Sequence, residues 1–244
     1  MAEVDLDRLA AAYPLRHEAA ARARAAETAA WAGIGAGSLV VDVGGGLGAA
    51  AEVMAACGSG AVVVDPSPAM VAGACRRPGV HAVRGRGEAM PVADGAADLV
   101  YFHLSLHHGD GRAMLEEAAR VSVGGGGVAV WTMDARRIAE GFLARWFPSV
   151  VEIDLVRFAS AGSVIRWMEE AGLERIEHAS RSEPVRRTAG DWERAVRAGF
   201  VSTLHLLDPA EVDAGLDSFR SAHPEPGAPI EYTLELLSVR GRRA

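Results

Sequence analysis

The sequence predicts an α/β fold, in which a doubly wound and mostly parallel sheet is covered by helices on both faces. From residue 39 to residue 133, short apolar runs alternate with segments of helix-forming composition. This alternation is typical of parallel strands that are joined by helices. Near the C-terminus, apolar and polar residues alternate at residues 230–236. That period of two predicts a strand with one buried face, suited to the end of the sheet.

The first half of the chain is expected to follow this alternation element by element. Residues 3–31 are rich in Ala, Arg and Glu, which are good helix formers, and Pro14 is expected to divide them into two helices. Strands are expected at residues 39–43, 61–65, 80–83, 98–104 and 128–133, and helices at residues 48–57, 67–75 and 110–122. The glycine run at residues 124–127 is expected to form a turn before the last of these strands.

In the second half, residues that begin or end helices predict where the elements lie. A helix is expected to end at Gly172, before a strand over residues 173–178. Two further helices follow, the first capped by Thr188 and the second by Asp208. The first of the two is expected to carry its apolar residues on one face: Trp192, Val196, Phe200 and Leu204.

Composition and charge exclude several classes of function. The 244 residues carry a net charge of −7 and no basic block, so a nucleic-acid partner is not expected. No run of about 18 apolar residues is present, so we expect no membrane span. The only cysteines are Cys57 and Cys75, and the N-terminus is acidic, which together favour a cytoplasmic protein without a disulfide framework. The histidines show no metal-ligand spacing, so no metal is expected. The sequence does not indicate an oligomeric state.

The most informative stretch is Leu-Val-Val-Asp-Val-Gly-Gly-Gly-Leu-Gly at residues 39–48. A buried strand ends there, and Gly44 and Gly46 allow a tight turn that a ligand can approach closely. Ala49 leaves a dinucleotide fingerprint open as an alternative. Asp42 argues against it, because a carboxylate repels a pyrophosphate and attracts a cationic ligand. The pattern therefore predicts a Rossmann-like turn that binds a positively charged cofactor.

A second carboxylate is expected at the end of the next strand. Asp65 closes the run 61–65, and a carboxylate can accept hydrogen bonds from two vicinal hydroxyl groups. Ligands of open α/β sheets bind at the carboxyl ends of the strands. Asp42, Asp65, the region around Gly87 and His103 are all expected at such ends.

From Leu39 to Val130 the chain resembles the class I S-adenosylmethionine-dependent methyltransferases, in particular those that act on small molecules. Five segments carry the resemblance, in the family's order and spacing. They are Val41-Asp42-Val43-Gly44-Gly45-Gly46-Leu47-Gly48, Val64-Asp65-Pro66-Ser67-Pro68-Ala69-Met70, Gly87-Glu88-Ala89-Met90-Pro91-Val92-Ala93-Asp94, Leu104-Ser105-Leu106-His107-His108 and Glu117-Ala118-Ala119-Arg120-Val121.

The resemblance implies S-adenosylmethionine as the cofactor and assigns residues to its site. The implied cofactor-binding residues are Asp42, Gly44, Gly46, Asp65, Pro66, Met70, Gly87, Glu88 and His103. His107 and His108 are candidate general bases, since an imidazole titrates near neutral pH, and closing the loop after the fourth strand is the alternative role. One position departs from the family, in which an acid commonly precedes Gly87 and accepts from the adenine amino group. Arg86 stands there and cannot accept.

The resemblance also implies an antiparallel C-terminal strand in the mostly parallel sheet. It implies a single methyltransferase domain with four parts. Residues 1–35 would form an N-terminal helical lid, 36–134 the cofactor-binding core, 135–229 the substrate-side segments with a helical insertion, and 230–244 the last strand. Within the lid, Tyr13, Arg16 and His17 could cover the cofactor, although a solvated helix face would explain them as well.

The expected activity is methyl transfer from S-adenosylmethionine to an O, N or C nucleophile of a small molecule. One alternative is a protein of this fold that binds the cofactor without methylating, which the Arg86 departure motivates. A less favoured alternative is an NAD(P)-dependent oxidoreductase, which the Ala49 overlap permits. The identity of the methyl acceptor is not encoded in any motif.

Overall fold

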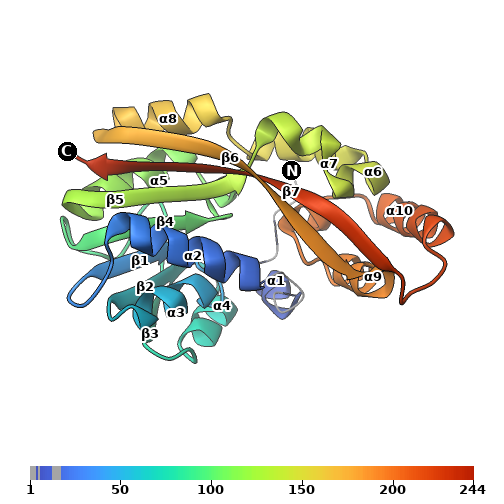
Figure 1. The fold of residues 1–244 in the computed structure, drawn as a ribbon, viewed down its shortest axis with the longest axis horizontal. Helices are drawn as coiled ribbons and strands as arrows, with labels where there is room; N and C mark the ends of the chain where they lie inside the picture. Colours follow the sequence, from blue (N-terminus) through green and yellow to red (C-terminus); the bar gives the residue numbers. More distant parts are fainter. Residues whose placement is uncertain (1–3, 5, 13–17) are drawn as a thin grey trace. The chain divides into compact units, whose positions relative to one another are not determined.

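The computed structural model describes residue 4 and residues 6–12 and 18–244. Its centre is a seven-stranded sheet in the order β3-β2-β1-β4-β5-β7-β6, shown in Figure 1. The strands are β1 (Leu39–Val43), β2 (Gly60–Asp65), β3 (Val80–Arg84), β4 (Ala97–His103), β5 (Ser122–Met133), β6 (Leu173–Thr188) and β7 (Pro229–Arg243). Most strands are parallel and the C-terminal strand is antiparallel, which confirms the predicted fold class.

Helices connect the strands and cover the sheet. The α-helices are α1 (Leu6–Ala12), α2 (Glu18–Ala32), α3 (Ala49–Ala56), α4 (Pro68–Ala74), α5 (Gly111–Val121), α6 (Phe142–Trp146), α7 (Ser149–Arg157), α8 (Ala161–Glu170), α9 (Ala189–Arg197) and α10 (Pro209–Ala222). Short 3₁₀ helices are η2 (Leu106–His108), η3 (Ala135–Glu140) and η4 (Ser202–His205). Pro14 and the proposed lid residues Tyr13, Arg16 and His17 lie outside the described residues.

The chain divides into two compact units. Unit 2 comprises His17–Thr132, Ala159–Ala179 and Leu237–Ala244, and unit 1 comprises Met1–Arg16, Met133–Phe158 and Ser180–Leu236. The four-part division of one domain stays a prediction. Among the described residues, no helix is both long enough and apolar enough to span a membrane.

In unit 2, the central strands β1 and β4 are buried on both faces of the sheet. Val41 and Val43 of β1 belong to a core cluster that also contains side chains of α5 and α8. Because side chains alternate along a strand, Val40 and Asp42 face the opposite side, where α2 and α3 pack together. An acid therefore lies within an apolar strand on that side.

The strand order reverses between β1 and β4. Strand β1 pairs in parallel with β2 on one side and β4 on the other, so Val43 lies in register with both Val64 and Phe102. The chain continues from β1 to β2 on one side of this point and from β4 to β5 on the other side. Such a reversal opens a crevice at the carboxyl ends of the strands. The segment that begins at Gly44 lies at this switch point.

The expected turn at residues 124–127 is wrong. These glycines lie within β5, which begins directly at Ser122. The pairing with β4 shifts from Ala97–Ser122 to Leu99–Gly127, which marks a β-bulge. Gly125 has a φ of +78°, a value that glycine adopts without strain. Flexible glycines here allow an irregular strand to form where a reversal of the chain was expected.

The starts of helices α5, α9 and α10 lie where the capping residues of the sequence predict them. The side chains of Asp110, Thr188 and Asp208 each accept a backbone N–H in the first turn of α5, α9 and α10. Helix α9 is shorter than expected: it ends at Arg197, before Gly199, which has a φ of +70°. Phe200 and Leu204 therefore lie beyond the helix, although both remain in the same core cluster as Trp192 and Val196. Strand β6 is longer than expected and extends to Thr188.

Unit 1 has an aromatic core of its own. Trp192 contacts Phe219 at a ring-centroid distance of 4.1 Å and stacks on Phe147 at 6.1 Å. Phe142 stacks on Tyr232 at 4.6 Å. Aromatic pairs at such distances add stabilisation beyond the area they bury, so the apolar residues of the second half form a packed cluster.

Candidate functional site

The glycine turn after β1 is held by backbone bonds from two neighbouring elements. Gly44 and Gly46 have φ values of +64° and +56°, which only glycine adopts readily. The Gly44 N–H donates to the Val64 carbonyl at 2.7 Å, and the Ser105 hydroxyl donates to the Val43 carbonyl at 2.6 Å. A Cβ on Gly44 would lie 2.6 Å from the Ser105 Cβ. No larger side chain fits at this position, and the turn presents bare backbone.

Asp65 is anchored to the same turn. Its two carboxylate oxygens accept N–H groups from Gly46 at 3.0 Å and from Ser67 at 2.9 Å. Ser67 in turn caps α4 by accepting the Met70 N–H at 3.1 Å. Pro66 lies exposed between them, and Met70 is buried. The structure thus brings Asp65 and the glycine turn together as the sequence predicts, with the carboxylate fixed in orientation.

Asp42 is the most unusual acid of the described residues. Its side chain is 1% exposed, and neither carboxylate oxygen has a hydrogen-bond partner among the described residues. Burial, together with the negative charge of Asp65, raises the pKa of Asp42 to about 7, and the backbone N–H of Ala51 offsets this only in part. A buried, unsatisfied carboxyl group is costly. A cationic ligand would supply the missing partner.

The Asp42 carboxylate packs directly on Gly45, which gives a testable consequence. A Cβ on Gly45 would lie 2.5 Å from Oδ2 of Asp42, and this carboxylate has no room to withdraw. We expect Gly45→Ala to lower the free energy of unfolding by about 1–3 kcal/mol through overpacking. Gly124→Ala is the matched control, since open space surrounds that position, and its effect should stay within about 0.5 kcal/mol. Chemical denaturation measures both, and equal effects would contradict this packing.

The loop around Gly87 is fixed by α5. Gly87 is buried against Met114, and Oε1 of Glu88 accepts the Asp110 N–H at 3.1 Å. Further along the loop, the Met90 N–H donates to Glu117 at 2.7 Å. Arg86 points its exposed guanidinium to Glu88, 3.5 Å away, so the residue that departs from the family pattern forms a surface ion pair.

The three candidate histidines occupy different positions after β4. His103 is the last residue of β4 and is half-buried. His107 and His108 lie in the 3₁₀ turn η2, with their rings tilted and 4.1 Å apart, and His108 is exposed. The His108 N–H donates to the Ser105 carbonyl at 3.0 Å, so this residue also closes the loop. Both the loop-closing role and the proton-transfer role stay open for this pair.

Two arginines near the site lie outside the sequence motifs. Arg77 donates to the Leu47 carbonyl of the glycine turn at 2.6 Å and is paired with Glu18 and Glu52. These carboxylates raise the pKa of Arg77 further. Arg24 of α2 contacts His103. Both contacts join residues far apart in sequence, and neither arginine belongs to a local pattern that would have indicated its role.

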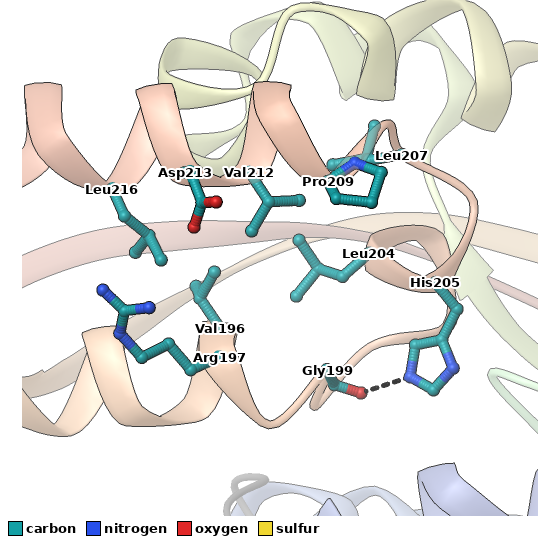
Figure 2. Close-up of a pocket in the computed structure, with 10 residues that line it drawn as sticks. All are labelled: Val196, Arg197, Gly199, Leu204, His205, Leu207, Pro209, Val212, Asp213 and Leu216. Carbon is teal, nitrogen blue, oxygen red and sulfur yellow. Dashed lines mark hydrogen bonds between the residues drawn. The ribbon is translucent and has the colours of Figure 1, made fainter.

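Unit 1 contains a cavity of about 260 Å³ between α9 and α10 (Figure 2). Five apolar side chains contribute to its lining: Val196, Leu204, Leu207, Val212 and Leu216. Arg197 of α9 and Asp213 of α10 also line it. His205 is fixed at one end by a 2.8 Å hydrogen bond with the Gly199 carbonyl. The cavity falls within the segment that the sequence assigns to the substrate side.

The residues at the switch point fit S-adenosylmethionine. Asp42 offers a buried carboxylate without a hydrogen-bond partner among the described residues, and Asp65 offers oxygens that can accept hydroxyl groups at the adjacent strand end. A Cβ on Gly44 or Gly45 would clash with Ser105 or Asp42, so this turn can be formed only by glycine backbone. A cationic sulfonium nucleoside with vicinal hydroxyls matches this donor and charge pattern.

Comparison with known proteins agrees with this chemistry. Residues 41–130 match the family model of the methyltransferase domain. No curated protein matches the sequence. Among solved structures, the chain is similar to the YcgJ protein of Bacillus subtilis, with a TM-score of 0.64 and 18% identity over 90% of this chain and 97% of that chain.

Two further structures show the same fold. A protein assigned as a methyltransferase of an antibiotic biosynthesis pathway in Anabaena variabilis has a TM-score of 0.65 and 22% identity, covering 86% of this chain and 92% of that chain. Geranyl diphosphate C-methyltransferase of Streptomyces coelicolor, solved with Mg²⁺, geranyl diphosphate and S-adenosyl-L-homocysteine, has a TM-score of 0.55 and 20% identity, covering 91% and 79%.

The fold, the switch-point chemistry and the family match lead to one class of protein. Residues 41–130 match a methyltransferase domain, over the stretch that carries the five motifs. The matched domain is that of an enzyme that transfers methyl groups. The prediction of a methyltransferase is thereby confirmed.

Proposed function

We propose that this protein is a class I methyltransferase that uses S-adenosylmethionine and acts on an O, N or C nucleophile of a small molecule, with the cofactor held at the carboxyl ends of β1, β2 and β4. The observation that carries the site is the Asp65 carboxylate, which is tied by the Gly46 N–H to the glycine turn beside Asp42. This arrangement supports a nucleoside lying across the switch point. The alternative of an NAD(P)-dependent oxidoreductase is disfavoured by Asp42, which would repel a pyrophosphate.

Each proposed residue has a distinct task. Asp65 would accept the ribose hydroxyls, with Pro66 and Met70 beside the nucleoside, and Gly87 and Glu88 would border the adenine. Asp42 would balance positive charge behind the glycine turn of Gly44 and Gly46, and His103 would line the end of β4. When bound, S-adenosylmethionine supplies the electrophilic methyl group. The chain contributes orientation and proximity, which can lower a barrier by about 7–11 kcal/mol in well-oriented reactions.

The acceptor's chemistry is proposed from two further features. His107 and His108 stand in one turn after β4 and are the candidates to take a proton from the acceptor. The unit 1 cavity combines apolar side chains with the charged Arg197 and Asp213, which favours a small molecule that has both apolar and polar parts. Geranyl diphosphate, the substrate in the Streptomyces coelicolor neighbour, is of that kind. Nucleic acid and membranes are not proposed as partners, since the net charge is −7.

An acceptor panel tests the proposal. The protein is incubated with S-adenosylmethionine and small molecules that carry hydroxyl, amine or activated carbon nucleophiles, and S-adenosylhomocysteine is quantified. We expect product with at least one class of acceptor and none without acceptor. In separate samples that contain NADH, addition of the protein should not change the NADH fluorescence. Cofactor binding without product from any acceptor would instead favour the non-methylating alternative.

A further inference from the structure

A buried arginine of α2 holds the imidazole at the end of β4. Arg24 is 5% exposed, and its Nε–H donates to Nε2 of His103 at 3.0 Å. Both residues belong to unit 2. The contact joins positions 79 apart in the chain, so it is created by the fold.

The position of Arg24 is set by a closed series of contacts. Its guanidinium lies over the ring of Trp131, 5.8 Å from the centroid. The Trp131 indole N–H donates to the Thr28 hydroxyl at 3.1 Å, and this hydroxyl donates to the Arg24 carbonyl at 2.8 Å. Trp131 is also the register partner of His103 across β4 and β5. Arginine and histidine are therefore both fixed to the same tryptophan.

This contact determines where the imidazole carries its proton. An arginine side chain donates hydrogen bonds and never accepts them. Nε2 of His103 must therefore be the acceptor, and the proton of the neutral ring is on Nδ1. A doubly protonated ring would place an N–H against an N–H and two positive charges side by side. The Arg24 contact thus disfavours both the other tautomer and the imidazolium.

His103 lies beside the proposed cofactor site. Val43 and Phe102 are register partners, so the next residues of the two strands, Gly44 and His103, occupy neighbouring strand ends. The following residue, Leu104, has a φ of +52° and its N–H donates to the Trp131 carbonyl at 2.8 Å. The backbone therefore ends the strand abruptly at His103, and strained residues of this kind concentrate at functional sites.

We propose that Arg24 is a positioning residue that fixes His103 as a neutral imidazole protonated on Nδ1, so that β4 ends in an N–H donor and not in a general base. The relevance of this donor to methyl transfer rests on the proposed function. With Nδ1 protonated and the lone pair of Nε2 bound to Arg24, this imidazole has no nitrogen that can take a proton. If the acceptor must lose a proton, a group other than His103 takes it.

Nitrogen NMR of the cofactor-free protein tests the tautomer directly. The His103→Gln variant identifies the His103 signals among the eight histidines. In the parent protein at neutral pH we expect Nδ1 protonated and Nε2 unprotonated. Arg24→Met should lose this fixed tautomer, whereas Arg24→Lys, which keeps a donor, should retain it. Arg112→Met, the same change at an exposed arginine paired with Glu116, should leave the signals unchanged.

Two results would overturn the proposal: an Nε2-protonated His103 in the parent, or an unchanged tautomer in a folded Arg24→Met protein. If Arg24→Met does not fold, the spectra of the parent and of Arg24→Lys still test the tautomer of His103.

A double-mutant cycle of ligand binding gives a second measurement. Arg24→Met and His103→Gln should each weaken S-adenosylhomocysteine binding about threefold to tenfold, and the double variant no more than the stronger single one. Additive losses of affinity would show that Arg24 does not act through His103. The NMR test of the tautomer does not depend on cofactor binding, so it remains valid if the proposed function is wrong.

Discussion

Asp65→Ala is expected to weaken the binding of S-adenosylhomocysteine about a hundredfold or more. Two charge-assisted hydrogen bonds to ribose hydroxyls contribute on the order of 1.5–3 kcal/mol each, and 1.4 kcal/mol corresponds to a tenfold change in affinity. The substitution also removes the acceptor of the Gly46 N–H, which frees the glycine turn. Isothermal titration calorimetry measures the loss directly.

The control for this experiment is Asp217→Ala, the same change at a largely exposed acid of α10. It should bind the ligand like the parent protein. Asp65→Asn keeps the shape of the side chain and one oxygen, so it should show an intermediate loss while retaining a cooperative melting transition. Parent-like affinity in a folded Asp65→Ala protein would remove Asp65 from the site.

Asp42→Asn is expected to stabilise the cofactor-free protein at about pH 8 and to weaken cofactor binding at the same time. Burial and the charge of Asp65 raise the pKa of Asp42 from 3.8 to about 7 in the folded state. A raised carboxyl pKa means that stability falls as the pH rises from 3.8 toward 7 and stays low above it. Ionisation of Asp42 therefore lowers the free energy of unfolding by an amount on the order of a few kcal/mol. In a chain of this size each kcal/mol changes the melting temperature by about 2–4 °C.

The pH dependence separates this effect from a general change in packing. Below the unfolded pKa both side chains are neutral, so the advantage of Asp42→Asn should vanish in acid and grow as the pH rises to about 7. Thermal melts across this range measure it, with Asp217→Asn as the exposed control. A constant difference at every pH would contradict a charged, unpartnered Asp42.

The same carboxyl links cofactor binding to pH. A cationic ligand favours the ionised form of Asp42, so binding of S-adenosylmethionine near pH 7 should release a proton. Its affinity should rise with pH up to about 7 and lose this dependence in Asp42→Asn. Titrations in buffers of different ionisation enthalpy count the protons released. The acid that destabilises the cofactor-free protein would thus stabilise the complex with the cofactor.

Local sequence signals predicted much of this fold because they act over a few residues. Strand β1 begins and ends where its apolar run does, and Asp110 caps its helix as the pattern indicates. The glycine run at 124–127 was misread because conformational freedom permits a turn without requiring one. The pairing with β4 decided the outcome, and pairing is a long-range contact.

The site follows the same rule. Asp42 and Asp65 could be predicted because strand ends of a parallel sheet meet at one edge. The buried state of Asp42 could not, since it depends on how α3 packs against β1. Arg24 and Arg77 reach the site from helix α2 and from the end of α4, across 79 and 30 residues. No spacing within one element reports such contacts.

A crystal structure of the protein with S-adenosylhomocysteine tests the central claim most directly. We predict ribose hydroxyls on the Asp65 carboxylate, the nucleoside against the backbone of Gly44 to Gly46, and Asp42 behind that turn. Density for the nucleoside elsewhere on the protein, or side chains filling the space above the glycine turn, would contradict the account.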